Sequence, residues 1–204
     1  MSAPISAIIF DIGNVLIQWD MRLLYRKLFP DEEAINRFID ETDLWAWNLE
    51  QDRGRDWNTA EEELVARAPH YENEIRAFRS RWHEMVPGPV SGTVAIKESL
   101  KEQAVPLYAI TNFASDTFIE TQQRFPFLYE FEDIIVSGEE RLIKPDKAIY
   151  NMLLQRNGLR AEECLFIDDS VANIEGARQV GLQTHHFIKP ELLGQDLRTR
   201  GFPI

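Results

Sequence analysis

The sequence predicts an α/β fold in which helices cover both faces of a parallel sheet and a helical cap interrupts the sheet domain. Two observations lead to this prediction. From residue 86 onward, short apolar runs bounded by turn residues alternate with segments of helical spacing, as in sheets built from strand–helix–strand units. The stretch from Met21 to Arg81 has helical spacing without a convincing strand, and it is too long for a crossover connection.

The first strand is predicted over residues 5–10, where apolar residues run directly into Asp11. The turn residues Val86-Pro-Gly-Pro end the helical stretch. Ser91 can then cap a helix that runs to about Gln103. A short apolar run over 105–110 predicts the second strand.

The remaining elements follow in the same alternation. A helix over 116–124 and a strand over 133–136 precede a helix over 146–157, which Gly158 can end as a left-handed C-cap. The apolar run 164–167 predicts the fourth strand, and a helix to Gln179, a turn at Gly181 and a last strand over 183–187 complete the sheet. Together these elements predict a Rossmann-like parallel sheet with an inserted cap. The predicted core domain comprises residues 1–18 and 86–204, and the predicted cap comprises residues 19–85.

Composition excludes several classes of partner. The net charge of −12 over 204 residues argues against nucleic acid and against an anionic membrane surface. No run approaches the ~20 apolar residues of a membrane span, and no signal peptide is evident at the N-terminus. Cys164 is the only cysteine, which excludes an internal disulfide framework and predicts a reducing, cytoplasmic location.

Polar residues follow four of the predicted strands. They are Asp11, the pair Thr111-Asn112, Lys144 in the segment after the third strand, and the pair Asp168-Asp169. In parallel sheets, ligands bind at the carboxyl ends of the strands, so these side chains are expected to share one site. Carboxylates crowded together repel each other unless a cation such as Mg²⁺ joins them. Thr111 and Lys144 could then hold phosphate oxygens, and Asp11 could attack phosphorus. Each motif alone has an ordinary alternative as a helix cap, a turn or a solvated loop; their order along the chain favours the site.

The motifs also resemble those of a known family. Asp11-x-Gly-Asn-Val, Thr111-Asn112, Lys144-Pro-Asp-Lys-Ala-Ile-Tyr and Phe-Ile-Asp168-Asp169-Ser-x-x-Asn173 are similar to the motifs of the haloacid dehalogenase (HAD) superfamily, subfamily I with a helical cap of the first type. The opening motif resembles the α-glucose-1-phosphate phosphatase-like branch. The resemblance implies that Asp11 is the nucleophile, that Thr111 and Lys144 bind the phosphoryl group, and that Asn112 shapes its pocket. It also implies that Asp11, Asp169, the carbonyl of Gly13 and, through water, Asp168 hold Mg²⁺.

One position departs from the family pattern. Most phosphatases of the superfamily carry a general acid–base Asp two residues after the nucleophile, where this chain has Gly13. Such help is worth about 10²–10⁴ in rate, so slower chemistry, or an acid from the cap or the substrate, is expected. Arg141 stands where a glycine is usual, and the sequence gives no account of it.

The cap is expected to determine specificity. Trp47, Asn48 and Arg53 are candidate substrate contacts, because aromatic faces pack on sugar rings and arginine binds phosphate. The alternative is core packing for the tryptophan and solvent exposure for the arginine.

The sequence therefore predicts a Mg²⁺-dependent phosphatase acting on a small phosphorylated metabolite, such as a sugar phosphate, through an aspartyl-phosphate. One alternative is a 2-haloacid dehalogenase that uses the same Asp11, which the paired acids Asp168-Asp169 disfavour. The other, suggested by Gly13, is a catalytically weak relative that binds a ligand or a protein. The physiological substrate and the oligomeric state are left open.

Overall fold

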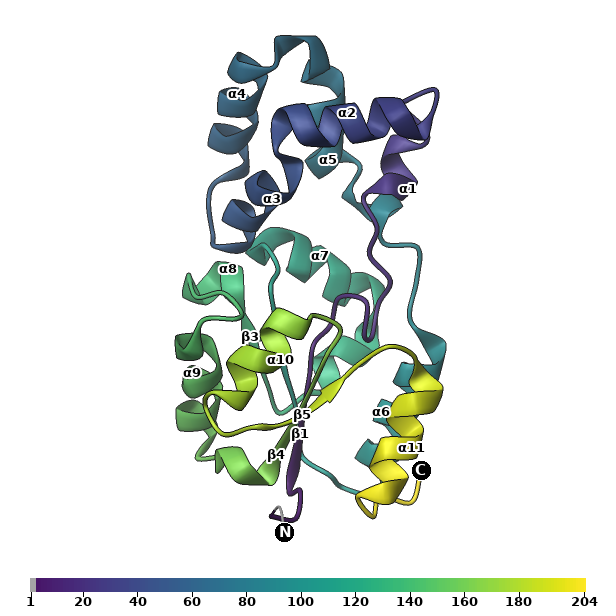
Figure 1. The fold of residues 1–204 in the computed structure, drawn as a ribbon, viewed down its shortest axis with the longest axis vertical. Coiled ribbons are helices and arrows are strands. Elements are labelled where there is room, and N and C mark those ends of the chain that lie inside the picture. Colours follow the sequence, from purple (N-terminus) through teal and green to yellow (C-terminus); the bar gives the residue numbers. More distant parts are fainter. Residues whose placement is uncertain (1–2) are drawn as a thin grey trace.

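The computed structural model describes residues 3–204, and its centre is a five-stranded parallel sheet (Figure 1). The strands are β1 (Ala7–Phe10), β2 (Leu107–Thr111), β3 (Asp133–Val136), β4 (Cys164–Asp168) and β5 (Gln183–His186). Their order is β3-β2-β1-β4-β5. The central strand β1 is fully buried, as expected for a continuous apolar strand with helices on both sides.

The register of the sheet aligns the strand ends. Phe10 of β1 pairs with Ile167 of β4, so the next residues lie at the same level: Asp11 directly after β1, and Asp168 as the last residue of β4. On the other side, Thr111 at the end of β2 pairs with Val136 at the end of β3. The polar residues that follow the strands are therefore gathered at one edge.

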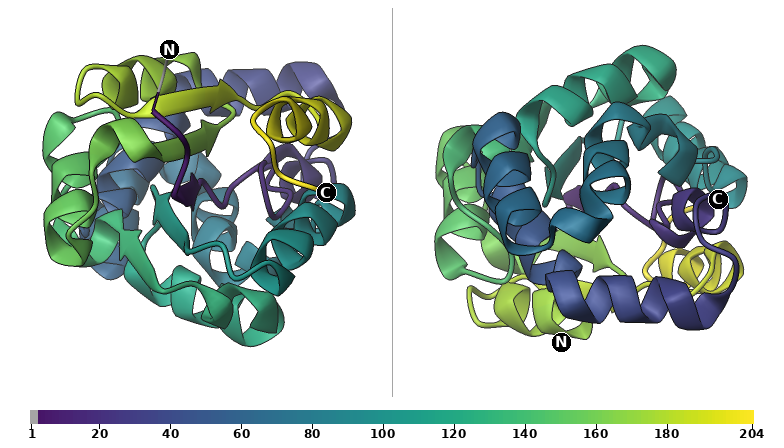
Figure 2. Two further views of the ribbon diagram at one scale, coloured as in Figure 1. Left: turned by 90° about the horizontal axis from the view of Figure 1, so that it is seen from below. Right: turned by 90° about the horizontal axis from the view of Figure 1, so that it is seen from above.

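Alternating side chains of the strands form two cores, one on each face. Ile8 and Phe10 belong to the larger core with residues of α6 (Ser91–Glu102), α7 (Ser115–Arg124) and α11 (Pro190–Thr199). Ala7 and Ile9 belong to the second core with α9 (Lys147–Asn157) and α10 (Val171–Arg178). Viewed along the long axis, the helices surround the sheet (Figure 2).

The helices between β1 and α6 form the cap, which lies above the carboxyl ends of the strands (Figure 1). Asp31 and Asp56 accept hydrogen bonds from the first turns of two of these helices, as N-caps do. The cap elements are α1 (Arg22–Tyr25), α2 (Glu32–Thr42), α3 (Leu44–Asp52), α4 (Trp57–Arg67), η1 (Pro69–Tyr71), α5 (Glu72–Ser80) and η2 (Trp82–Met85).

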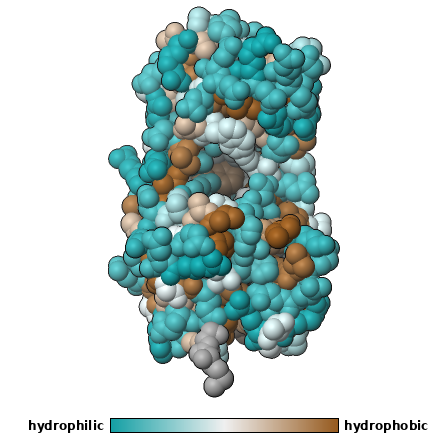
Figure 3. Space-filling model, in the orientation of Figure 1, coloured by the Kyte–Doolittle hydropathy of each residue, from teal (hydrophilic) through white to brown (hydrophobic). Residues whose placement is uncertain are grey.

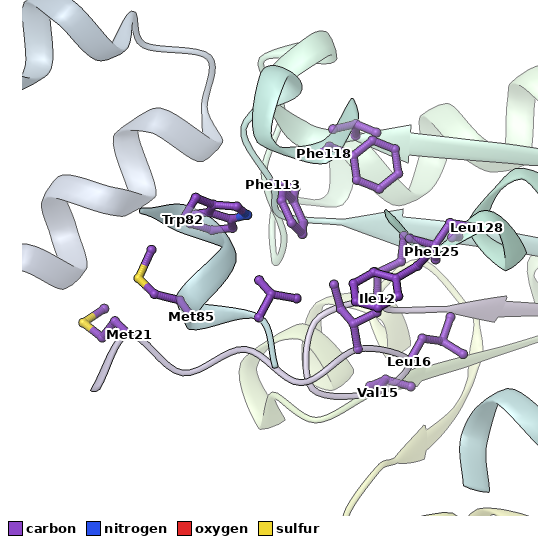
Figure 4. Packing of buried hydrophobic residues seen from close by; sticks show 14 of the residues in the cluster. Ile12, Val15, Leu16, Met21, Trp82, Met85, Phe113, Phe118, Phe125 and Leu128 are labelled. Atoms are coloured by element: carbon purple, nitrogen blue, oxygen red, sulfur yellow. The ribbon is translucent and has the colours of Figure 1, made fainter. Parts of the chain in front are cut away.

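Two kinds of contact join the cap to the sheet domain. Trp82 of η2 packs on Phe113 after β2, with ring centroids 5.5 Å apart (Figure 4). Arg79 of α5 pairs with Asp116 and Glu120 of α7 at 3.0 and 2.7 Å. The cap therefore has both an apolar and an ionic connection to the β2–α7 region.

The two chain segments that connect the cap to the sheet domain run side by side. The backbone N–H of Gln18 donates to the carbonyl of Gly88, and that of Asp20 donates to the carbonyl of Met85, both at 2.9 Å. Val90 likewise donates to Leu16 at 2.8 Å. The connection is thus a short hydrogen-bonded ladder.

The structure confirms the predicted fold class, with local differences. The C-cap at Gly158 is confirmed, with φ of 62°. Ser91 does not cap α6 but is its first residue, so that prediction is wrong. Four further helices of the sheet domain were not predicted from the sequence: α11, α8 (Ser137–Glu140), η3 (Pro126–Glu130) and η4 (Ala161–Glu163). The predicted domain boundaries stay a prediction. Within the described residues, no helix has the length and apolar character needed to span a membrane.

Candidate active site

A buried lysine connects two of the strand-end carboxylates. The Lys144 ammonium lies 2.7 Å from Asp11 Oδ1 and 2.7 Å from Asp168 Oδ2, and all three side chains are buried. Burial by itself lowers the pKa of Lys144, but the two carboxylates outweigh this effect and raise it. Lys144 is therefore a permanent positive charge at this edge of the sheet.

Asp168 is fully buried and is held by donors on several sides. Asn173 Nδ2 lies 3.0 and 3.1 Å from its two oxygens, and the backbone N–H of Ser170 donates to Oδ1 at 2.8 Å. With Lys144 on Oδ2, both oxygens of Asp168 have partners. Asp169, the next residue, is exposed. The two acids thus differ in environment: Asp168 is enclosed by its donors, while Asp169 remains accessible.

Asn112 fixes the backbone of the lysine. Its side chain accepts from the N–H of Lys144 at 2.9 Å and donates to the carbonyl of Lys144 at 3.1 Å. Thr111, the preceding residue, is buried at the end of β2. The predicted residues Asp11, Asn112, Lys144, Asp168 and Asp169 are thereby brought together.

The acidic residues form a group that fits a divalent cation. One oxygen from each of Asp11, Asp168 and Asp169 lies within 4.8 Å of the others. Burial raises the pKa of Asp11 to about 8, against the opposing effect of Lys144. Partial desolvation, and then the nearby charge of Asp168, also raise the pKa of Asp169. A single ammonium does not balance three carboxylates, and oxygen ligands are those that Mg²⁺ prefers.

Gly13 adjoins this group in a turn after β1. The left-handed residue of the turn is Asn14, with φ of 54°, a conformation that Asn adopts more readily than most residues. Gly13 itself is not among the residues with positive φ, and a Cβ atom at Gly13 would have no neighbour within 4 Å. Steric crowding therefore does not require glycine here.

A cavity of about 250 Å³ lies above the carboxylates, between the sheet domain and the cap. Figure 3 shows the surface hollowed between the two parts. The floor consists of polar residues of the sheet domain, and the wall is largely aromatic. The lining residues are Asp11, Gly13, Asn14, Asn112 and Asp169 with Trp19, Trp45, Leu49, Trp82 and Phe113, and the two polar cap residues Asn48 and Asp52.

Of the three cap residues predicted to contact substrate, the structure brings only Asn48 to this cavity. Trp47 lies in the core of the cap, where its indole N–H donates to the carbonyl of Ala60 at 3.1 Å, so core packing is its observed environment. Arg53 pairs with Glu50 at 3.5 Å and with Asp146 at 3.9 Å and does not line the cavity.

Trp45 and Asp52 also line the cavity and were not among the residues predicted from the sequence. With Asn48 and Leu49 they line the cavity at positions i, i+3, i+4 and i+7 of α3, which is one face of a helix. That spacing was visible in the sequence, but Leu44, Trp47 and Gln51 are buried on the opposite side. Apolar residues on both sides concealed which face meets the cavity.

Asp52 is a buried carboxyl group in the cavity wall. Burial raises its pKa to about 7, although the backbone N–H of Ala114 acts in the opposite direction. Asn48 Nδ2 lies 3.2 Å from Asp52 Oδ2. Asp52 thus combines access to the cavity with a pKa near neutrality.

The backbone conformation of Arg141 explains why glycine is usual at this position. Its φ is 56°, in the left-handed region, where glycine carries no steric cost. Arg141 lies outside the cavity lining.

Comparisons with known proteins agree with this architecture. Residues 5–181 match the family model "haloacid dehalogenase-like hydrolase". The sesquiterpene phosphatase astK of Aspergillus oryzae is 26% identical over 188 residues, which cover 91% of each chain.

Among solved structures, the HAD family enzyme BT-2542 of Bacteroides thetaiotaomicron has a TM-score of 0.74 at 21% identity, over 96% of this chain and 100% of that one. A complex of that wild-type protein with magnesium and inorganic phosphate has a TM-score of 0.67 at 21% identity, over 91% and 95% of the chains. The L-2-haloacid dehalogenase of Xanthobacter autotrophicus has a TM-score of 0.64 at 16% identity, over 98% and 85%. These structural likenesses establish a shared fold.

Proposed function

The chain belongs to the haloacid dehalogenase-like hydrolases, and from this premise we propose that it is a Mg²⁺-dependent phosphatase acting on a small phosphorylated metabolite. The observation that carries the proposal is the contact of Lys144 with Asp11 and Asp168, next to Asp169, at the carboxyl ends of the strands; Asp11 and Asp169 of this group line the cavity floor. Lys144 supplies charge for an anionic substrate in an otherwise acidic protein.

In the proposed mechanism, Asp11 attacks phosphorus and forms an aspartyl-phosphate, which water then hydrolyses. Asp11 has the access this requires, since it lines the cavity. Lys144 uses two of its three N–H donors on Asp11 and Asp168, and the third is the one proposed to bind a phosphoryl oxygen. Thr111 is the second proposed phosphoryl ligand. Asn112 acts by holding the Lys144 backbone.

Asp11, Asp169 and the carbonyl of Gly13 are the proposed ligands of Mg²⁺, with Asp168 acting through water. The hydrogen bonds that occupy both oxygens of Asp168 support an indirect role. When bound, the ion neutralises the carboxylates and stabilises charge on the phosphoryl oxygens.

The aromatic wall of the cavity indicates which kind of alcohol the phosphate ester carries. Trp19, Trp45, Trp82 and Phe113 suit an alcohol moiety with a ring or an apolar surface. Sugar phosphates meet this requirement because indole faces pack on sugar rings. Phosphates of apolar alcohols meet this requirement because the wall can bury their hydrocarbon chain. The similarity to a sesquiterpene phosphatase supports such phosphates as a second candidate substrate class.

A 2-haloacid dehalogenase remains the alternative enzyme, and a binding protein of low activity is the other. The dehalogenase uses the carboxylate of Asp11 on carbon and does not need the acidic pair. The acidic group of Asp11, Asp168 and Asp169 favours the phosphatase over both.

The deciding experiment measures phosphate release from p-nitrophenyl phosphate and from a panel of sugar and prenyl monophosphates, with Mg²⁺ and with EDTA. We expect turnover that EDTA abolishes and Mg²⁺ restores. Halide release from 2-chloropropionate without metal would instead identify a dehalogenase. Binding of the panel without turnover of any member would identify a binding protein.

The cavity wall gives a prediction about specificity. Replacing Trp45 by Ala is expected to raise KM for the preferred metabolite by about 2–10-fold, since an aromatic contact is worth about 0.5–1.5 kcal/mol. A small generic substrate should be affected less.

Trp47→Ala is the matched comparison on the same helix. Trp47 is buried and packs on Phe78 with centroids 5.4 Å apart, so its removal should cost about 3–5 kcal/mol of stability and leave the ratio of the two substrates unchanged. If Trp47→Ala raised KM more for the preferred metabolite than for the small substrate, and Trp45→Ala did not, Trp45 would not be the residue that contacts the substrate.

A further inference from the structure

Gly13 leaves the proposed reaction without its usual proton donor. The leaving oxygen needs a proton when its bond to phosphorus breaks, and the attacking water must later lose one. The carboxyl groups that line the cavity are Asp11, Asp169 and Asp52. Asp11 and Asp169 are already assigned to attack and to the metal. Asp52 is the one cavity-lining carboxyl group to which the proposed mechanism gives no role.

Asp52 is positioned by contacts between the cap and the sheet domain. It is the last residue of α3, and its backbone carbonyl accepts a hydrogen bond from Ser137 Oγ at 2.5 Å. The same Ser137 oxygen accepts from the backbone N–H of Phe113 at 2.8 Å. Asp52 is therefore tied to the ends of β2 and β3, where the phosphoryl group is expected.

The surroundings of the carboxyl group suit proton transfer. Asn48 on the preceding turn and the backbone N–H of Ala114 donate toward it, which fixes its orientation. Among residues 3–204, no Lys, Arg or His lies within ion-pair distance of it. An acid without a cationic partner is not locked in its ionised form.

We propose that Asp52 is the general acid and base of the reaction, in place of the side chain missing at Gly13; the inference rests on the proposed phosphatase function. In the first step, an Asp11 oxygen bonds to phosphorus, the bond from phosphorus to the leaving oxygen breaks, and the Asp52 proton passes to that oxygen. In the second step, Asp52 takes a proton from water as the water oxygen bonds to phosphorus and the bond to Asp11 breaks. Phosphate, the free Asp11 carboxylate and protonated Asp52 result.

The raised pKa of Asp52, about 7, supports this role. At neutral pH both protonation states are populated, and an efficient acid–base catalyst has a pKa near the working pH. Burial is the physical cause, so the cap supplies both the carboxyl group and the environment that tunes it.

The test compares Asp52→Asn with Glu50→Gln, each loaded with Mg²⁺. Glu50 lies two residues earlier on α3, outside this cavity, so the control loses a carboxylate from the same helix. Rapid-mixing kinetics use p-nitrophenyl phosphate, whose leaving group needs little protonation, and the phosphate of a long-chain aliphatic alcohol, whose leaving group needs it. Circular dichroism and thermal unfolding verify the fold.

With p-nitrophenyl phosphate, we expect Asp52→Asn to release about one equivalent of p-nitrophenol per enzyme in a fast burst. Slow turnover follows, about 10²–10⁴-fold below wild type, because only the second step lacks its base. With the alkyl phosphate there is no burst, because the first step also lacks its acid. Glu50→Gln should match wild type on both substrates.

Wild-type turnover of both substrates by Asp52→Asn would overturn the proposal. So would an equal loss on both without a burst, which indicates a structural role. If Asp52→Asn does not fold, Asp52→Ser is measured in the same way under the same criteria. Absence of Mg²⁺-dependent hydrolysis in the wild-type protein would overturn the phosphatase function itself, and this inference with it.

Discussion

Replacing Asp11 by Asn is expected to abolish phosphate release. Asparagine keeps the shape of the side chain, but its amide cannot attack phosphorus, so kcat should fall by about 10⁴–10⁶-fold, the scale seen when enzymes lose a catalytic nucleophile. Phosphate release with Mg²⁺ measures the effect, and circular dichroism verifies the fold.

The matched control for Asp11→Asn is Asp146→Asn. Asp146 is an exposed carboxylate two residues after Lys144, and its loss should leave kcat unchanged. Wild-type turnover by Asp11→Asn would exclude an aspartyl-phosphate mechanism.

The second large effect is expected for Lys144→Met. Methionine fills the volume of the aliphatic chain but leaves Asp11 and Asp168 buried without their shared cation. Breaking a buried ion pair on one side costs about 3–5 kcal/mol, and hydrolysis should be lost as well. Urea unfolding at neutral pH measures the stability, with Lys147→Met, an exposed lysine on the next helix, expected within about 0.5 kcal/mol of wild type.

The destabilisation of Lys144→Met should depend on pH. Lys144 lowers the pKa of Asp11, which burial nevertheless raises to about 8 from 3.8, so removing the lysine raises it further. The folded variant then binds more protons than the unfolded chain, and its stability falls as pH rises above about 4. Both folded forms hold the Asp11 proton up to about pH 8, above which wild type loses it and the variant does not, so the deficit relative to wild type should be smaller at about pH 6 than at about pH 9. An equal deficit at both values would indicate lost packing instead of unpaired charge.

The strand ends could be predicted because their signal is local. An apolar run that stops at Asp11, or at Asp168-Asp169, marks both a strand and its carboxyl end, and parallel topology then gathers these ends. The structure confirms the sheet and brings Asp11, Asn112, Lys144 and the acidic pair together. Their catalytic roles stay predictions.

The cap residues that line the cavity could not be predicted as well as the strand ends, because no local sequence pattern identifies them. Residues 44–52 carry tryptophans on opposite sides of α3, and composition does not tell which side meets the cavity. That choice depends on packing of α3 against α4 and against α8, which only the assembled structure contains. For this reason Trp47 was predicted as a substrate contact, whereas Trp45 is the tryptophan of α3 that lines the cavity, and Asp52 was not predicted at all.

The ladder that joins Gln18 to Gly88 and Asp20 to Met85 has a consequence for how substrates are selected. Because the two connecting segments are hydrogen-bonded to each other, we expect the cap to move as one body, which would carry Trp45, Asn48 and Asp52 of α3 to or from the cavity together. A molecule that fills the wall stabilises the closed cap and thereby gains the proton donor, whereas a phosphate too small to reach the wall gains neither. Discrimination between substrates would then be expressed in kcat as well as in KM, as in enzymes whose closure assembles the catalytic groups.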